Sequence, residues 1–217
     1  MSLVHAIWRP NLEGPLPTVV ALHGHGAHGM DLIGLAPLLA RGRVLVICPE
    51  AEIPLNGQAG SFTWFARQGE ASRTPEEFER VTGVVRAFID EAVPRYGGDP
   101  SRVVVLGFSQ GGTLAYRLGL GEPERFRGVA ALSTYLPEEA IEHAAPNEAV
   151  AALPILIQHG TADPQIAVER AHQSHALLLA MGAQPDYREY PMHHQIGAAS
   201  MSDLSDWLER VLALPPR

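Results

Sequence analysis

The sequence contains no lysine, and all 16 of its basic residues are arginine. This absence excludes Schiff-base chemistry, a P-loop that binds phosphate through lysine, and a Ser-x-x-Lys catalytic pair. The 24 acidic residues give the chain a net charge of −8, and no arginine cluster forms the basic face that nucleic-acid binding requires. We therefore expect no nucleic-acid partner.

Cysteine is scarce, and long apolar runs are absent. Cys48 is the only cysteine, so the chain forms no intrachain disulfide, which is typical of a protein from a reducing compartment. Residues 1–10 lack the basic and apolar regions of a secretory signal, and no apolar run approaches the roughly 18 residues needed to span a bilayer. We expect a cytoplasmic protein without integral membrane association.

The composition predicts a single folded domain over residues 1–217. Hydrophobic residues make up 46% of the chain and charged residues 18%, which is enough to fill a substantial core. Short runs rich in Val, Ile and Leu alternate with longer helical patterns, which indicates a mostly parallel central sheet with helices on both faces. The strands are expected at Val19–His23, Val44–Ile47, Val103–Phe108, Gly128–Leu132, Ile155–His159 and, near an edge, Asp186–Tyr190.

The clearest helix start lies at Thr74, an N-cap residue followed by Pro75 and by Glu77 three positions after the cap. Two longer stretches, Pro49–Arg73 and Ser133–Leu153, are expected to be irregular, and loops of this length often serve as lids or binding loops. The helices are expected at Asp31–Ala40, Pro75–Val93, Gln110–Leu120, Ile166–Met181 and Met201–Leu212.

The sharpest chemical signal is a G-x-S-x-G motif in Gly107-Phe108-Ser109-Gln110-Gly111-Gly112. The motif lies directly between a predicted strand and a predicted helix, where a nucleophile elbow holds its serine in a strained, very tight turn. Small residues are needed on both sides because strand and helix nearly touch there. The spacing predicts Ser109 as a nucleophile, exposed at the carboxyl edge of the sheet.

A serine hydroxyl needs a base and an orienting carboxylate, and in this topology both follow later strands in the order Asp, His. Asp163 follows Ile155–His159, and the pair His193-His194 follows Asp186–Tyr190. Asp163 is also placed to cap a helix. We expect Asp163 to orient the base, and one of the two histidines to be that base.

The Gly-rich loop His23-Gly24-His25-Gly26 follows the first predicted strand and suits an oxyanion hole, with the backbone N–H of Gln110 as the second donor. A rival interpretation takes His23, His25 and His28 as zinc ligands, because the segment matches an H-x-H-x-D-H pattern except that Ala27 replaces the aspartate. The missing carboxylate and the serine elbow favour a metal-free site, and we expect no cofactor.

We expect the acyl group of a substrate to bind against apolar side chains of the two irregular stretches. Phe62-Thr63-Trp64-Phe65, within a Gly-rich segment, is the foremost candidate for substrate contact, although each of its apolar side chains could equally pack in the core. The full set of candidates is Leu55, Phe62, Trp64, Phe65, Tyr135, Leu136 and Met192.

With these motifs in order, the chain resembles the phospholipase/carboxylesterase family of α/β-hydrolases, which includes the acyl-protein thioesterases. The resemblance runs from about Val19 to Leu212 and depends mainly on the serine motif with its glutamine and double glycine. It implies Ser109 as nucleophile, Asp163 as orienting acid and the backbone of His25 and Gln110 as oxyanion donors. Family members often have Met-Gly-His-Glu at the last site, which implies His194 as base, with His193 in the place of glycine.

The resemblance implies a serine carboxylesterase, thioesterase or lysophospholipase that hydrolyses small to medium acyl esters through an acyl-enzyme intermediate. Its partner would be a small-molecule ester or thioester, and the sequence is compatible with a homodimer. Two alternatives stay open: the zinc-dependent hydrolase described above, and a non-catalytic α/β-hydrolase homologue that acts as a binding module.

Overall fold

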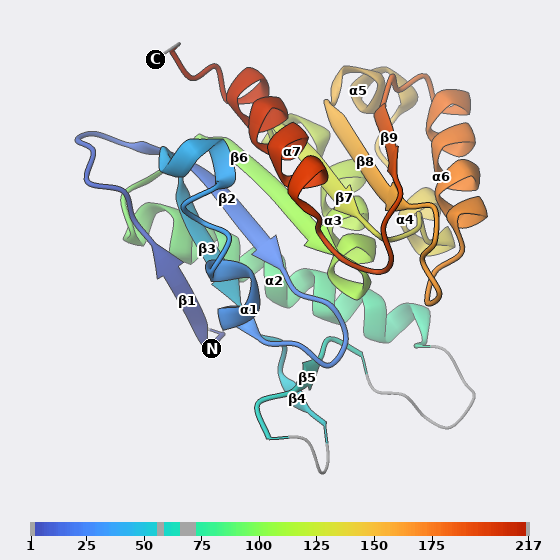
Figure 1. The fold of residues 1–217 in the computed structure, drawn as a ribbon, viewed down its shortest axis with the longest axis horizontal. Helices are drawn as coiled ribbons and strands as arrows, with labels where there is room; N and C mark the ends of the chain where they lie inside the picture. Colours follow the sequence, from blue (N-terminus) through green and yellow to red (C-terminus); the bar gives the residue numbers. More distant parts are fainter. Residues whose placement is uncertain (1–2, 56–58, 66–72, 216–217) are drawn as a thin grey trace.

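The computed structural model describes residues 3–55, 59–65 and 73–215 of the chain. Its centre is a seven-stranded sheet with the strand order β1-β3-β2-β6-β7-β8-β9 (Figure 1). All neighbouring strands pair in parallel except β1, which pairs with β3 in the antiparallel sense. The strands are β1 (His5–Trp8), β2 (Leu16–Leu22), β3 (Leu45–Pro49), β6 (Gly98–Phe108), β7 (Gly128–Leu132), β8 (Ile155–Gly160) and β9 (Asp186–Tyr190).

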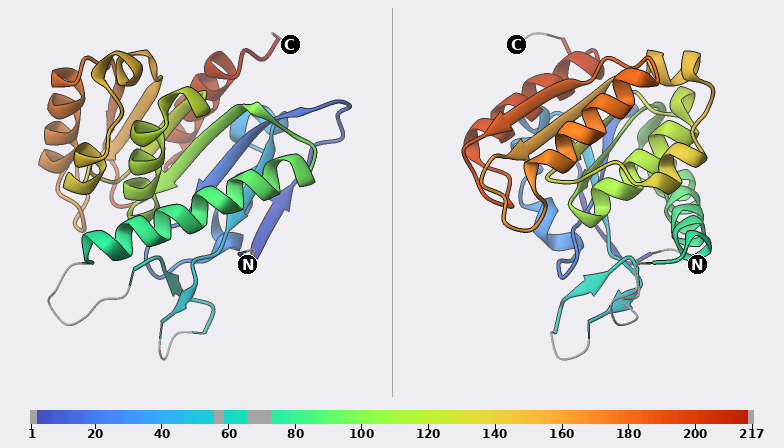
Figure 2. Two further views of the ribbon diagram at one scale, coloured as in Figure 1. Left: turned by 180° about the vertical axis from the view of Figure 1, so that it is seen from behind. Right: turned by 90° about the vertical axis from the view of Figure 1, so that its right-hand side faces the viewer.

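Helices cover both faces of the sheet. On one face lie α1 (Gly29–Ile33), the 3-10 segment η1 (Leu39–Gly42) and α7 (Ala198–Val211). The opposite face carries the long α2 (Pro75–Arg95), α3 (Gln110–Gly121) and α6 (Val168–Ala180), as the view from behind shows (Figure 2). The shorter elements are η2 (Pro123–Arg125), α4 (Glu138–Glu142) and α5 (Asn147–Ala152).

The central strands are buried because both of their faces are apolar. Every residue of β2, β3, β7 and β8 is buried, as expected for parallel strands between two helical layers. Two hydrophobic clusters result, one on each face of the sheet. Among the described residues, no helix combines the length and the apolar character needed to cross a bilayer.

The expected strands are present, with small changes at their ends. β7 and β9 match the expected bounds, and β9 lies at an edge of the sheet as predicted. β6 begins five residues earlier than expected, at Gly98, because Leu16 of β2 pairs with that residue across a register shift. Sequence periodicity cannot show such pairing between distant segments.

The start of α2 also agrees with the sequence. Thr74 Oγ1 accepts a hydrogen bond from Glu77 N over 3.2 Å, and Pro75 occupies the first helical turn. The expected helix Asp31–Ala40 is only partly formed, since α1 ends at Ile33 and the chain continues through turns into η1.

The stretches predicted as irregular contain short elements. Within Pro49–Arg73, β4 (Ile53–Pro54) and β5 (Phe62–Thr63) pair as an antiparallel hairpin, while residues 56–58 and 66–72 lie outside the described residues. Ser133–Leu153 contains α4 and α5, so that expectation is wrong for about half of this stretch. Ala27 forms an isolated bridge with Phe62, which attaches the β4–β5 hairpin to the loop after β2.

Candidate active site

Ser109 occupies the tight turn between β6 and α3. Its backbone has φ 52° and ψ −117°, a left-handed conformation that L residues rarely adopt. Hydrogen bonds hold the turn on both sides: Ser109 N donates to Leu132 O over 2.9 Å, and Thr134 Oγ1 donates to Ser109 O over 2.7 Å. The strain is therefore imposed by the surrounding chain, as in a nucleophile elbow.

The glycines of the motif permit a close approach of strand and helix. A Cβ atom on Gly107 would lie 2.2 Å from Gly111 O, and one on Gly111 would lie 2.2 Å from Leu22 O. Both neighbours are backbone atoms that cannot turn away. The spacing in the sequence motif is thus a direct consequence of steric contact at the turn.

We expect Gly111→Ala to lower the free energy of unfolding by about 3 kcal/mol or more, because the added methyl group overlaps backbone atoms. Urea unfolding measures this change. Gly83→Ala is the matched control, because Gly83 lies inside α2 with no atom within 4 Å of a built Cβ, and removal of a helical glycine there stabilises by about 0.5–1 kcal/mol. Equal stabilities of the two variants would contradict the proposed packing.

The carboxylate of Asp163 is anchored in the loop after β8. Its Oδ1 accepts hydrogen bonds from Gln165 N over 2.8 Å and Ile166 N over 3.0 Å, and the side chain is 0% exposed. Burial alone would raise the pKa of Asp163, but these backbone hydrogen bonds together with that of His194 outweigh it, so the pKa lies below its usual value. The group is therefore a buried, ionised carboxylate.

This lowered pKa gives a stability prediction with a defined sign. Because the folded pKa of Asp163 is depressed, its contribution to stability is complete above the unfolded pKa of about 3.9 and is lost as the pH falls through the folded pKa. The difference in melting temperature between wild type and Asp163→Asn should therefore stay nearly constant from about pH 7 to about pH 5 and shrink as the pH falls below about 4. Thermal unfolding followed by circular dichroism measures it; a difference independent of pH would contradict the assignment.

The structure distinguishes the two histidines of the last loop. His194 Nδ1 donates to Asp163 Oδ2 over 2.7 Å, and its side chain is 8% exposed. His193 is exposed, and its Nδ1 lies 2.9 Å from Ala162 O, a backbone carbonyl. A ring that donates through Nδ1 to a carboxylate presents the unprotonated Nε2 on its other side. The arrangement fits His194 for the role of base.

The imidazole of His194 lies beside the elbow. Its ring centroid is 4.8 Å from that of Phe108, the residue that precedes Ser109. Between the described side chains of Ser109 and His194 the structure contains no hydrogen bond, and catalytic hydrogen bonds in free enzymes are often long until substrate binds.

The loop after β2 lies against the serine. A Cβ atom on Gly24 would come within 3.2 Å of Ser109 Cβ, so the backbone of this loop passes directly beside the hydroxyl-bearing side chain. Gln110 is the first residue of α3, and its N–H therefore has no acceptor within the helix. The loop that contains His25 and the first residue of α3, Gln110, therefore both lie next to Ser109.

Thr63 connects these two donors, a role that the sequence analysis missed. Thr63 Oγ1 lies 3.0 Å from His25 Nδ1 and 3.1 Å from Gln110 Oε1, and Gln110 Oε1 also accepts from Trp64 N over 3.0 Å. The β4–β5 hairpin thereby fixes both residues. A threonine inside an irregular stretch gives no sequence signal for such a contact, because the contact depends on tertiary placement.

The three histidines of the alternative zinc site make other contacts. Both ring nitrogens of His23 are used, by Gly24 O over 2.7 Å and by Ala51 N over 3.0 Å, and burial lowers the pKa of this ring. His28 Nδ1 accepts from Met30 N and caps α1. Across the described ranges, no three His, Cys, Asp or Glu side chains lie close enough together to hold a metal ion.

The candidate pocket residues divide into two groups. Trp64 is 2% exposed and Phe65 3%, and both belong to the main core; Trp64 Nε1 donates to His23 O over 2.9 Å. Leu136 and Met192 are also buried. The half-buried candidates are Leu55, Phe62 and Tyr135.

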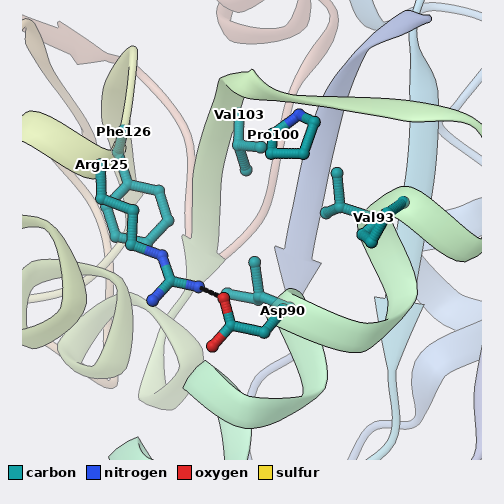
Figure 3. Close-up of a pocket in the computed structure, with 8 residues that line it drawn as sticks. Asp90, Val93, Pro100, Val103, Arg125 and Phe126 are labelled. Atoms are coloured by element: carbon teal, nitrogen blue, oxygen red, sulfur yellow. Dashed lines mark hydrogen bonds and ion pairs between the residues drawn. The ribbon is translucent and has the colours of Figure 1, made fainter.

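A hollow of about 320 Å³ lies at the opposite edge of the sheet, between α2 and the start of β6 (Figure 3). Arg125 forms an ion pair with Asp90 across it, and its other walls are apolar side chains and prolines. None of the described residues that line the hollow is a serine, cysteine or histidine.

Comparisons with known proteins identify the family of this chain. Residues 10–212 match the family model described as Phospholipase/Carboxylesterase. Acyl-protein thioesterase 1 of Cryptococcus neoformans is 27% identical over 97% of this chain and 98% of its own length. A probable carboxylesterase of Oryza sativa subsp. japonica is 27% identical over 88% of this chain and 86% of its own length.

The solved structure of a Bacillus cereus carboxylesterase has the same fold, with a TM-score of 0.81 and 22% identity over 96% of this chain and 94% of that one. The expected α/β-hydrolase fold is thereby confirmed.

Proposed function

Because the chain belongs to the phospholipase/carboxylesterase family, we propose that it hydrolyses acyl esters through a triad of Ser109, His194 and Asp163. It is a hydrolase that acts on ester or thioester bonds, in keeping with its family and its named relatives. The triad gives this activity a mechanism in which the acyl group passes from substrate to serine and then to water.

In the first step His194 Nε2 removes the proton of Ser109 Oγ as this oxygen attacks the substrate carbonyl. The C–O or C–S bond of the leaving group then breaks, and His194 returns the proton to it. Asp163 accepts from His194 Nδ1 throughout, which fixes the tautomer and stabilises the charged imidazole.

The negative charge of the tetrahedral intermediate develops on the former carbonyl oxygen, which the backbone N–H groups of His25 and Gln110 bind. Water repeats the sequence on the acyl-enzyme and releases the carboxylic acid. The strained turn at Ser109 and the bonds from Thr63 keep these donors in place before substrate arrives, so little reorganisation is needed during the reaction.

One observation carries the proposal above all others: a serine with φ 52° at a strand-to-helix turn whose neighbouring imidazole donates to a buried carboxylate over 2.7 Å. Strained backbone at a residue other than glycine clusters at active sites, and a buried carboxylate that accepts from an imidazole is the means by which a triad orients its base.

The acyl group is proposed to bind along the half-buried face of the β4–β5 hairpin. Leu55 Cδ1 would lie 4.0 Å from a Cβ on Gly26, and Phe62 forms backbone hydrogen bonds with Gly26 and Ala27. These apolar side chains therefore lie next to the oxyanion loop, and Tyr135 follows β7 at the same edge.

The proposal is tested with a fluorophosphonate probe and a panel of p-nitrophenyl esters and acyl thioesters of increasing chain length. We expect stoichiometric labelling, with the added mass on the peptide that contains Ser109, and labelled protein that no longer turns over any member of the panel. Full activity of the labelled protein, or label on another residue, would overturn the proposed triad.

A further inference from the structure

The side chain of His159 is buried beside the proposed triad and has no part in the mechanism above. It lies on β8, one residue before the end of the strand, and is 0% exposed. Its Nδ1 is buried without a hydrogen-bond partner among the described residues. A buried polar atom without a partner destabilises a fold. We therefore asked whether the other ring nitrogen, Nε2, makes contacts that account for a histidine at this position.

That other nitrogen, Nε2, lies 2.8 Å from Ile166 O. A carbonyl oxygen only accepts, so Nε2 carries the proton and the ring is held in one tautomer. The bond closes the loop that carries Asp163, because Ile166 N in turn donates to Asp163 Oδ1 over 3.0 Å. His159 thus holds the residue that holds the carboxylate.

The same Nε2 lies 3.5 Å from Asp163 Oδ2, the oxygen that accepts from His194. The N–H dipole therefore acts on the carboxylate oxygen that faces the base, without replacing His194 as its hydrogen-bond donor. This contact favours the ionised carboxylate and its present orientation.

The end of β8 also presses against the loop that carries the base. A Cβ on Gly160, the next residue, would lie 2.2 Å from Met192 O and 2.5 Å from His193 O. A shift of His159 would therefore move the acid loop relative to the histidine loop.

We propose that His159 is a positioning residue that orients Asp163 toward His194 through its Nε2–H group. The proposal rests on the proposed function, since it presupposes that Asp163 and His194 act together on Ser109. The proposal also explains the buried Nδ1 of His159, which has no hydrogen-bond partner among the described residues. An apolar side chain would avoid this unpaired atom, but it would not supply an N–H donor beside the carboxylate of Asp163.

Three substitutions of His159 distinguish the effect of losing the N–H donor from the effect of changing the side-chain volume. His159→Leu removes both nitrogens, and His159→Asn keeps an amide that is too short to reach Ile166 O. His159→Gln places an N–H donor at the same number of bonds from Cα as Nε2. We expect the Leu and Asn variants to lose about 10- to 100-fold in kcat with little change in KM, and the Gln variant to recover most of the loss.

Proton NMR reports directly on the orientation of the Asp163 carboxylate toward His194. The low-field proton resonance of the His194 Nδ1–H···Asp163 hydrogen bond should be present in wild type and His159→Gln, and shifted or lost in His159→Leu and His159→Asn. His143→Leu is the control, because His143 is exposed and bonds to Glu139 O at the end of α4; it should leave kcat and the resonance unchanged.

The outcomes distinguish the two proposals. If Ser109→Ala is inactive while His159→Leu and His159→Asn match wild type in kcat and resonance, the positioning role is wrong and the triad stands. Failure of both variants to fold would assign His159 to fold stability and would equally overturn the inference. Full turnover by Ser109→Ala would remove the triad, and with it this role.

Discussion

Ser109→Ala should lower kcat for ester hydrolysis on the order of 10⁶-fold, with the fold and substrate binding retained. The substitution removes the proposed nucleophile but leaves the proposed backbone donors of His25 and Gln110, so a residual rate of about 10³–10⁴-fold over the uncatalysed reaction should persist. Alanine and serine both carry a Cβ, so the φ of 52° is equally strained in both. Steady-state kinetics, with melting temperature as the check on folding, measure the effect.

The chain offers a matched control in Ser133. This serine also has a positive φ, 46°, and it is buried at the end of β7 with an Oγ that has no partner in the described structure. Ser133→Ala should retain most of the wild-type kcat, because backbone strain alone does not make a nucleophile. If Ser133→Ala lost activity and Ser109→Ala kept it, the nucleophile would be Ser133, at the end of β7. That result would contradict the proposed triad.

The features that could be predicted from the sequence are those with local causes. The buried strands appear as short apolar runs, and the N-cap at Thr74 has its own residue pattern. The elbow at Ser109 is predictable because its motif is local in sequence: Gly107 meets a steric demand within the turn, whereas Gly111 meets one set by the end of β2. The order of Ser, Asp and His then follows from the topology of a parallel sheet.

The features that could not be predicted depend on tertiary contacts. β1 is a four-residue edge strand with exposed Ile7 and Trp8, and it exists because it pairs with β3. Likewise, Trp64 appears in the sequence as a candidate pocket wall, but its indole packs on His23 and donates to the backbone there. Periodicity carries no information about which distant segment a short apolar run will meet.

The site shows the same division between local and tertiary information. His193 and His194 are adjacent in sequence and equal in chemistry, so spacing alone leaves both open and only the family resemblance favours His194. The carboxylate of Asp163 selects one ring, and the carbonyl of Ala162 takes the other. The proposed role of His159 likewise depends on a bond to Ile166, seven residues away, across a loop whose shape the sequence does not specify.

His194→Ala should therefore lower kcat by about 10⁴-fold or more, whereas His193→Ala should change it by less than about threefold. His194 is the ring that donates to a buried carboxylate over 2.7 Å, and its loss would remove the proposed acceptor for the proton of Ser109. The side chain of His193 is exposed, and its Nδ1 lies 2.9 Å from the carbonyl oxygen of Ala162, so its variant is a control with the same change one position away. Initial rates with a p-nitrophenyl ester, measured across pH, decide between them. Activity that survives in His194→Ala but disappears in His193→Ala would make His193 the base and would leave the His194–Asp163 hydrogen bond without a catalytic purpose.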